Sequence, residues 1–184
     1  MKTVDKYLFQ ALDNYPFWLE GTIESLDYAL SYDEKNTMAL VLYGRLHAEQ
    51  LFDYETAKLY YQQALGVNIH AVAVYKYYIQ ALLLNEDYGE AAKLINFALT
   101  VKGINKAEII LQQAFLLERQ RGYKAALKLL KEAKLLNYSK KMVHEIEEAE
   151  KRLKSKKQLV LGKKKTKKQI KLKSGKRKDR KSSC

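Results

Sequence analysis

Residues 53–65 read DYETAKLYYQQAL, and this pattern of small and large apolar residues occurs four times in the 184-residue chain. The small residue near the end of the stretch is alanine in every unit, and successive alanines are 35, 34 and 35 residues apart. These anchors are Ala29, Ala64, Ala98 and Ala133. Three more columns keep the same register: Thr22, Ala57, Ala91 and Ala126; Leu26, Tyr61, Ile95 and Leu130; and Leu19, Tyr54, Tyr88 and Tyr123. A period near 34 residues is typical of arrays of helical hairpins.

The spacing within each unit explains the pattern physically. Offsets of three, four and seven residues place the column members on one face of an α-helix. Small residues suit the places where two helices cross closely, and the larger apolar side chains fill the space beside them. One such unit can arise in any amphipathic helix, but four columns in register over four units favour a true repeat.

These residues resemble the tetratricopeptide repeat family, whose second helix opens with D-Y-x-x-A and continues to Y-x-x-A-L. Residues 53–65, 87–99 and 122–133 carry the match, and the first unit departs from it at Leu19 and Thr22. The resemblance covers residues 3–138. It implies an all-α fold: a right-handed solenoid of about four helix-turn-helix units over residues 1–138.

Two details depart from the usual repeat. The proline that often closes a unit is absent, and the second unit has one extra residue between Gly44 and Ala57. Gly44 lies inside a predicted helix, where glycine costs about 1 kcal/mol relative to alanine. We expect a neighbouring helix to approach closely at this position, as the resemblance implies.

Charge divides the chain into a body and a tail. Residues 1–153 carry 19 Lys or Arg and 20 Asp or Glu, whereas residues 154–184 carry 15 and one. We expect residues 139–153 to form a polar-faced capping helix, since a stacked array must shield its last interface from water. Residues 154–184 are too charged to bury a core, so we expect a flexible, disordered tail.

The composition also bears on location. The single cysteine, Cys184, permits no internal disulfide, and the chain has neither an apolar signal core nor a run long enough to span a membrane. We expect a cytoplasmic protein, or a nuclear one if the source cell has a nucleus.

No catalytic, cofactor or metal motif is evident. His47, His70 and His144 lack metal-ligand spacing, and the sequence contains no phosphate-binding glycine loop and no nucleophile elbow. We therefore expect no enzymatic activity, no cofactor and no metal.

The resemblance implies a concave groove lined by the first helix of each unit. The residues at its usual groove positions are Met38, Val41, Arg45, Ala73, Lys76, Gln80, Leu83, Glu108, Leu111, Phe115 and Glu118. Tyr77 joins them because it cannot share the packing face of Tyr75 and Tyr78. Arg45 and Lys76 are isolated cations, so a partner's extended segment or amphipathic helix suits this groove better than a clamped carboxylate. The alternative is that several apolar members simply pack within the array.

The tail is the second candidate site. Its basic residues are Lys163, Lys164, Lys165, Lys167, Lys168, Lys171, Lys173, Lys176, Arg177, Lys178, Arg180 and Lys181. Such density suits a phosphate backbone, and an anionic membrane surface or a purely solubilising role are alternatives. The leading hypothesis is a non-enzymatic adaptor or scaffold that binds a protein in its groove and a polyanion through its tail. The alternative is a nucleic-acid- or ribosome-associated protein whose tail is the primary site.

Overall fold

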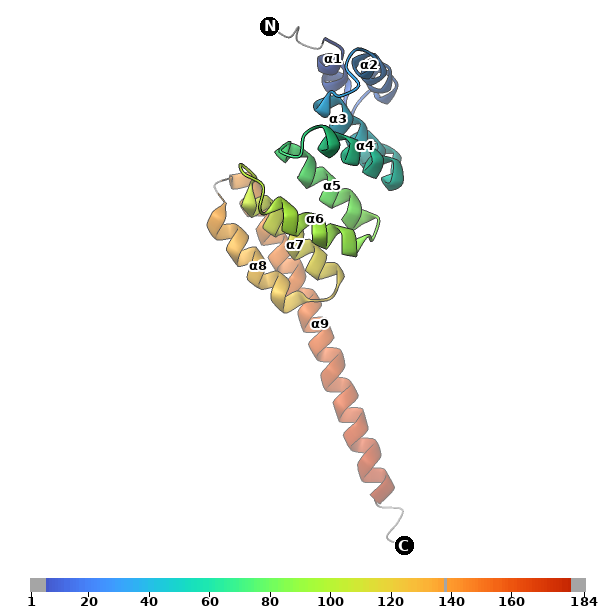
Figure 1. The fold of residues 1–184 in the computed structure, drawn as a ribbon. Coiled ribbons are helices and arrows are strands. Elements are labelled where there is room, and N and C mark those ends of the chain that lie inside the picture. The colour runs from blue at the N-terminus through green and yellow to red at the C-terminus, as the bar shows by residue number, and fades with distance from the viewer. Residues whose placement is uncertain (1–5, 138, 180–184) are drawn as a thin grey trace.

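The chain folds as a succession of α-helices. The structure, a computed structural model, describes the backbone of residues 6–137 and 139–179 and the side chains of 6–137 and 139–160. Within these ranges the elements are helical, with no strand, as the sequence predicts. They are α1 (Lys6–Asn14), α2 (Leu19–Tyr32), α3 (Thr37–Leu46), the π-helix η1 (His47–Leu51), α4 (Tyr54–Val67), α5 (Val72–Leu84), α6 (Tyr88–Ala98), α7 (Lys106–Arg119), α8 (Tyr123–Leu136) and α9 (Lys140–Asp179) (Figure 1).

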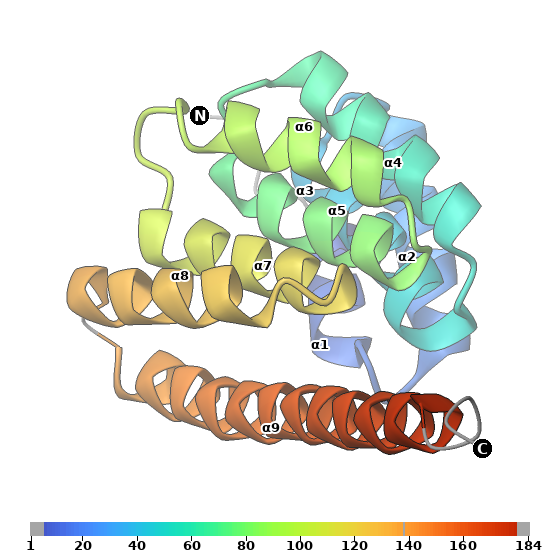
Figure 2. The same cartoon turned by 90° about the horizontal axis from the view of Figure 1, so that it is seen from below.

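The helices pack as consecutive hairpins. Helices α1 and α2, α3 and α4, α5 and α6, and α7 and α8 form the four pairs, and α9 packs on α8. The first helices of neighbouring pairs also touch, so that contacts run from α1 through α3, α5 and α7 to α9 (Figures 1 and 2). These first helices therefore form one continuous row along the molecule.

The repeated columns form the core of the hairpins. All twelve residues of the three columns headed by Ala29, Thr22 and Leu26 have 0% of their surface exposed. The fourth column, headed by Leu19, is partly buried at the edge of each hairpin. Burial at a fixed spacing in four units explains why the pattern is visible in the sequence.

The extra residue of the second unit is accommodated by the π-helix η1. Its wider turn takes up one residue more than an α-helix between Gly44 and the next hairpin helix. Phe52 follows it in the left-handed conformation, with φ 54°, and turns the chain into α4. Glu86 and Arg121 occupy the matching turns of the next two hairpins with the same positive φ of 62°.

The last helix differs from the expectation. The capping segment does form, and Met142, Ile146, Ala149 and Leu153 pack against α7 and α8. However, α9 does not end near Leu153 but continues to Asp179, beyond the rest of the fold (Figure 1). The continuation is rich in lysine, a good helix former, and has no proline, so a helix is permitted despite Gly162 and Gly175. None of the described helices is long and apolar enough to cross a membrane.

Candidate functional site

Three adjoining hollows follow the row of first helices. The first, of about 480 Å³, lies between α1, α3 and α5; the second, of about 210 Å³, lies between η1, α4 and α5; the third, of about 550 Å³, lies between α5, α7 and α9. Tyr77 lines both the first and the second, and Gln80 and Leu84 line both the second and the third. The three hollows are therefore neighbours along α5, and we call them together the inner groove.

The N-terminal end of the inner groove is mainly apolar. Met38 on α3 is 61% exposed at its rim, opposite Val72 and Ala73 at the start of α5. Val41 is nearly buried, with 9% of its surface exposed, and it also lines this hollow. An exposed apolar hollow of this size suits one or two apolar side chains of a ligand.

Arg45 stands in the middle of the inner groove with its charge already paired. Its Nε and one terminal nitrogen lie 3.0 and 3.1 Å from the two carboxylate oxygens of Glu49 on η1. The guanidinium lies between two aromatic rings, 4.4 Å from the centroid of Tyr77 and 4.8 Å from that of Tyr15. The Tyr15 hydroxyl donates a hydrogen bond to Glu49, and burial together with this hydrogen bond raises the pKa of Tyr15 to about 12. Arg45 is therefore held by an acidic partner on the next helical turn and by two aromatic neighbours.

Lys76 is paired in the same way. Its ammonium group forms a salt bridge with Glu108, which joins α5 to α7 across the groove. Both groove cations thus have acidic partners, one on the next helical turn and one on a neighbouring helix. A paired cation is a poor anchor for a free carboxylate, since the incoming group must displace its partner.

The C-terminal end of the inner groove is built around Glu118. Both oxygens of this nearly buried carboxylate accept hydrogen bonds from Arg152 of α9, at 2.9 and 2.8 Å, and Lys156 donates a third at 2.7 Å. These donors, Arg152 foremost, lower the pKa of Glu118 to about 2. The Arg152 guanidinium also lies 5.6 Å from the ring centroid of Phe115. This network fixes α9 against α7.

Most of the expected groove residues are brought together. Those that line the hollows are Met38, Val41, Arg45, Ala73, Lys76, Tyr77, Gln80, Leu83, Phe115 and Glu118. Leu111 is only 2% exposed and belongs to the core between α7, α8 and α9, so its assignment to the groove is corrected. Glu108 contributes through its salt bridge to Lys76. The twelve basic tail residues from Lys163 to Lys181 lie outside the described side chains.

Three charged lining residues carry no signal in the repeat pattern. Glu49 lies on the π-helix η1, and Arg152 and Lys156 lie on α9, outside the repeats. The repeat pattern does not place these elements relative to the groove. The pairing of Arg45 with Glu49 had a possible signal, since residues four apart on a helix are neighbours.

Comparison with protein-family models and with curated proteins gives no match. The site must therefore be interpreted from its own chemistry. Among the described residues, no group of three His, Cys, Asp or Glu side chains is placed to hold a metal ion. The inner groove offers apolar surface, aromatic rings and ion pairs, which can hold a ligand by apolar packing and hydrogen bonds.

Proposed function

We propose that this chain is a tetratricopeptide-like solenoid that acts as a non-enzymatic adaptor or scaffold and holds a segment of a protein partner in the inner groove. The observation that carries the proposal is the succession of three neighbouring hollows along α5, which share Tyr77, Gln80 and Leu84 as lining residues. Support for the solenoid comes from the row of contacts that links the first helices. A groove along stacked hairpins suits an elongated ligand better than a small molecule.

The chemistry of the groove indicates the kind of segment. Its apolar end, near Met38, suits a hydrophobic anchor, and its central and C-terminal parts present cations whose charge is already balanced by Glu49, Glu108 and Glu118. The partner should therefore be an extended strand or amphipathic helix that binds through apolar anchors and neutral hydrogen bonds. A ligand whose affinity depends on one terminal carboxylate is disfavoured.

The test uses two exposed groove residues. Met38→Glu with Ala73→Glu places charges in the apolar hollow without touching the core, and Leu135→Glu, 85% exposed on α8, is the matched control. The intact chain and both variants are purified with their partners from the source cells at low salt. We expect partners that the wild type and the control retain and the groove variant loses. Retention of every partner by the groove variant would reject the proposal.

We further propose that the basic C-terminal segment attaches the adaptor to a polyanion. The excess of lysine and arginine after residue 153 supports this part. The alternative function, a nucleic-acid- or ribosome-associated protein, makes that attachment the primary activity. A chain ending at Val160 distinguishes them, because it keeps the bond from Lys156 to Glu118 while removing the twelve basic residues that follow Val160. Loss of protein partners on this truncation would favour the alternative.

The proposed activity requires no catalytic group and no cofactor. We place it in the cytoplasm, or in the nucleus of a cell that has one, where the lone Cys184 would remain reduced. Attachment to an anionic membrane surface is the less favoured form of the polyanion contact.

A further inference from the structure

A second hollow, away from the inner groove, lies between α8 and α9. It has a volume of about 350 Å³ and is lined by Lys124, Lys128 and Lys131 of α8 and by Lys154 and Lys157 of α9. Its remaining lining residues are Leu127 and Glu150, so five lysines surround the hollow with a single carboxylate among them, and its wall is formed mainly by the aliphatic stems of these lysines and by Leu127. It shares no lining residue with the three hollows of the inner groove. We call it the lysine hollow.

The lysines of this hollow are poorly neutralised. Glu150 pairs with Lys154 at 3.5 Å, but Lys124, Lys128, Lys131 and Lys157 form no salt bridge with any described residue. Folding brings these like charges together from α8 and α9. The face of α8 that packs in the core, with Ala126, Leu130 and Ala133, lies opposite the face that carries its three lysines. Such a concentration of uncompensated charge attracts anions strongly at low ionic strength.

Beyond the lysine hollow, α9 continues into the most basic part of the sequence. Between residues 161 and 179 the sequence has ten Lys or Arg, and the helix backbone covers all of them. From Lys154 to Asp179 the helix extends about 38 Å at 1.5 Å per residue. A compact anion would meet only a small part of this length, whereas a nucleic-acid duplex carries one charge per about 1.7 Å of its axis.

The lining of the lysine hollow has no aromatic side chain on which a base could stack. Its chemistry is therefore matched to phosphates, which carry no sequence information. The apolar residues beyond Val160 do not recur at the spacing of an amphipathic helix that lies in a membrane surface.

We propose that the lysine hollow is a binding site for the phosphate backbone of a nucleic-acid duplex, and that it works together with the basic continuation of α9. This inference rests on the proposed polyanion attachment, to which it gives a partner class and a site on the folded body. Binding is independent of sequence and weakens steeply with salt, because each neutralised phosphate releases counterions.

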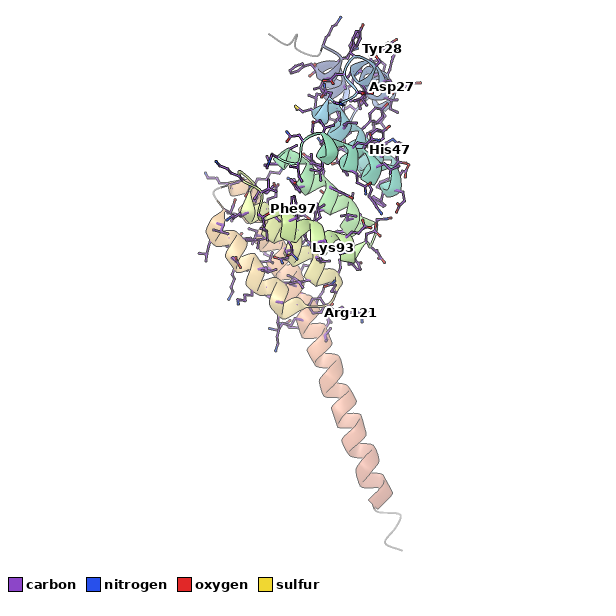
Figure 3. All side chains as sticks on the ribbon, in the orientation of Figure 1. Asp27, Tyr28, His47, Lys93, Phe97 and Arg121 are labelled. Carbon is purple, nitrogen blue, oxygen red and sulfur yellow. The ribbon has the colours of Figure 1, made fainter. Side chains whose placement is uncertain are left out.

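The test compares two full-length variants with the same change in net charge. Lys124→Glu, Lys128→Glu and Lys131→Glu alter the exposed lysines of α8. Lys93→Glu, Lys102→Glu and Lys106→Glu, also exposed, alter lysines that do not line the hollow, such as Lys93 on α6 (Figure 3). Corresponding glutamine variants separate loss of attraction from added repulsion. Circular dichroism checks that each variant keeps its helix content.

Affinities for an RNA and a DNA duplex of about 24 base pairs are measured by fluorescence anisotropy from about 50 to 200 mM salt. The hollow variant should bind at least about tenfold more weakly, and the slope of log K against log salt should fall by about 2.7, or 0.9 for each lost contact. The control variant should stay within about threefold of the wild type. A preference between the two duplexes would identify the source of the phosphates.

Three outcomes would overturn the inference. Unchanged affinity and slope in the hollow variant, with binding lost only on truncation after Val160, would leave the polyanion attachment intact but assign it to the tail alone. Equal losses in both variants would assign binding to net charge. Binding to vesicles of phosphatidylcholine and phosphatidylserine without binding to duplexes would replace nucleic acid by membrane.

Discussion

Gly44 of α3 lies directly against the ring of Tyr61 of α4. A β-carbon added at Gly44 would lie 2.5 Å from Cε1 of that ring, and Tyr61 is fully buried. The ring therefore has no room to move away. This contact fulfils the sequence expectation that glycine inside this helix permits a close approach.

The first prediction concerns this contact. Gly44→Ala should destabilise the protein by about 1–3 kcal/mol, because overpacking outweighs the better helix propensity of alanine. Gly66→Ala is the matched control, since a β-carbon there meets no atom within 4 Å. The control should be neutral or more stable by up to about 1 kcal/mol. Urea unfolding measures both, and equal stability of the two variants would contradict the packing argument.

The second prediction concerns the pH dependence of the bond between Glu118 and Arg152. The folded pKa of Glu118, about 2, lies below its ordinary value of 4.5. The carboxylate therefore stabilises the fold above pH 4.5, and this contribution is lost as the pH falls from 4.5 towards 2. Glu118→Gln should cost roughly 1–3 kcal/mol at neutral pH, a value that allows for solvent screening of the half-exposed Arg152 and Lys156.

The measurement is urea unfolding of wild type and variant across this pH range. The difference between them should shrink towards zero at the acid end. Glu145→Gln, which lines the same hollow from the exposed side of α9, is the control and should change stability by less than about 0.5 kcal/mol. A stability difference that does not vary with pH would show that Glu118 acts by packing alone.

The third prediction concerns the π-helix. Deleting Leu51, which is 47% exposed, removes the residue that η1 accommodates, so the hairpin of α3 and α4 should still form with an ordinary α-helical turn. Deleting the exposed Gln80 in the middle of α5 should instead rotate the following turn out of the core by about 100°. We expect cooperative thermal unfolding for the first variant and its loss for the second. Equal damage from both deletions would mean that η1 has a required role of its own.

The fourth prediction separates core from groove. Leu111→Ala should cost about 2–5 kcal/mol, because it opens a cavity between α7, α8 and α9. Met38→Ala, at an exposed position, should cost less than about 0.5 kcal/mol but weaken partner binding if the groove proposal holds. Chemical denaturation and a binding assay of the two variants give the answer. A stability change below about 1 kcal/mol for Leu111→Ala would contradict its place in the core and favour its assignment to the groove.

The repeat columns could be predicted because their cause is local. Helix geometry places residues three, four and seven apart on one face, so the spacing of Ala57, Tyr61 and Ala64 predicts that all three are buried. The same periodicity predicts the helices and their pairing, whereas the groove positions follow from the resemblance to the tetratricopeptide repeat family. It did not separate Leu111 from Phe115, since both lie on the inward side of α7 and only the position of α9 decides which is covered.

The helical class, the spacing of the hairpins, most of the apolar core and the concentration of charge after residue 153 can be predicted from the residues alone. Which charges meet depends on how the helices pack: Glu118 pairs with Arg152, Lys76 pairs with Glu108, and the lysines of α8 lie beside those of α9. Burial can be predicted because it repeats with the period of the helix. A salt bridge between distant helices instead depends on how whole elements are placed, which no local spacing records.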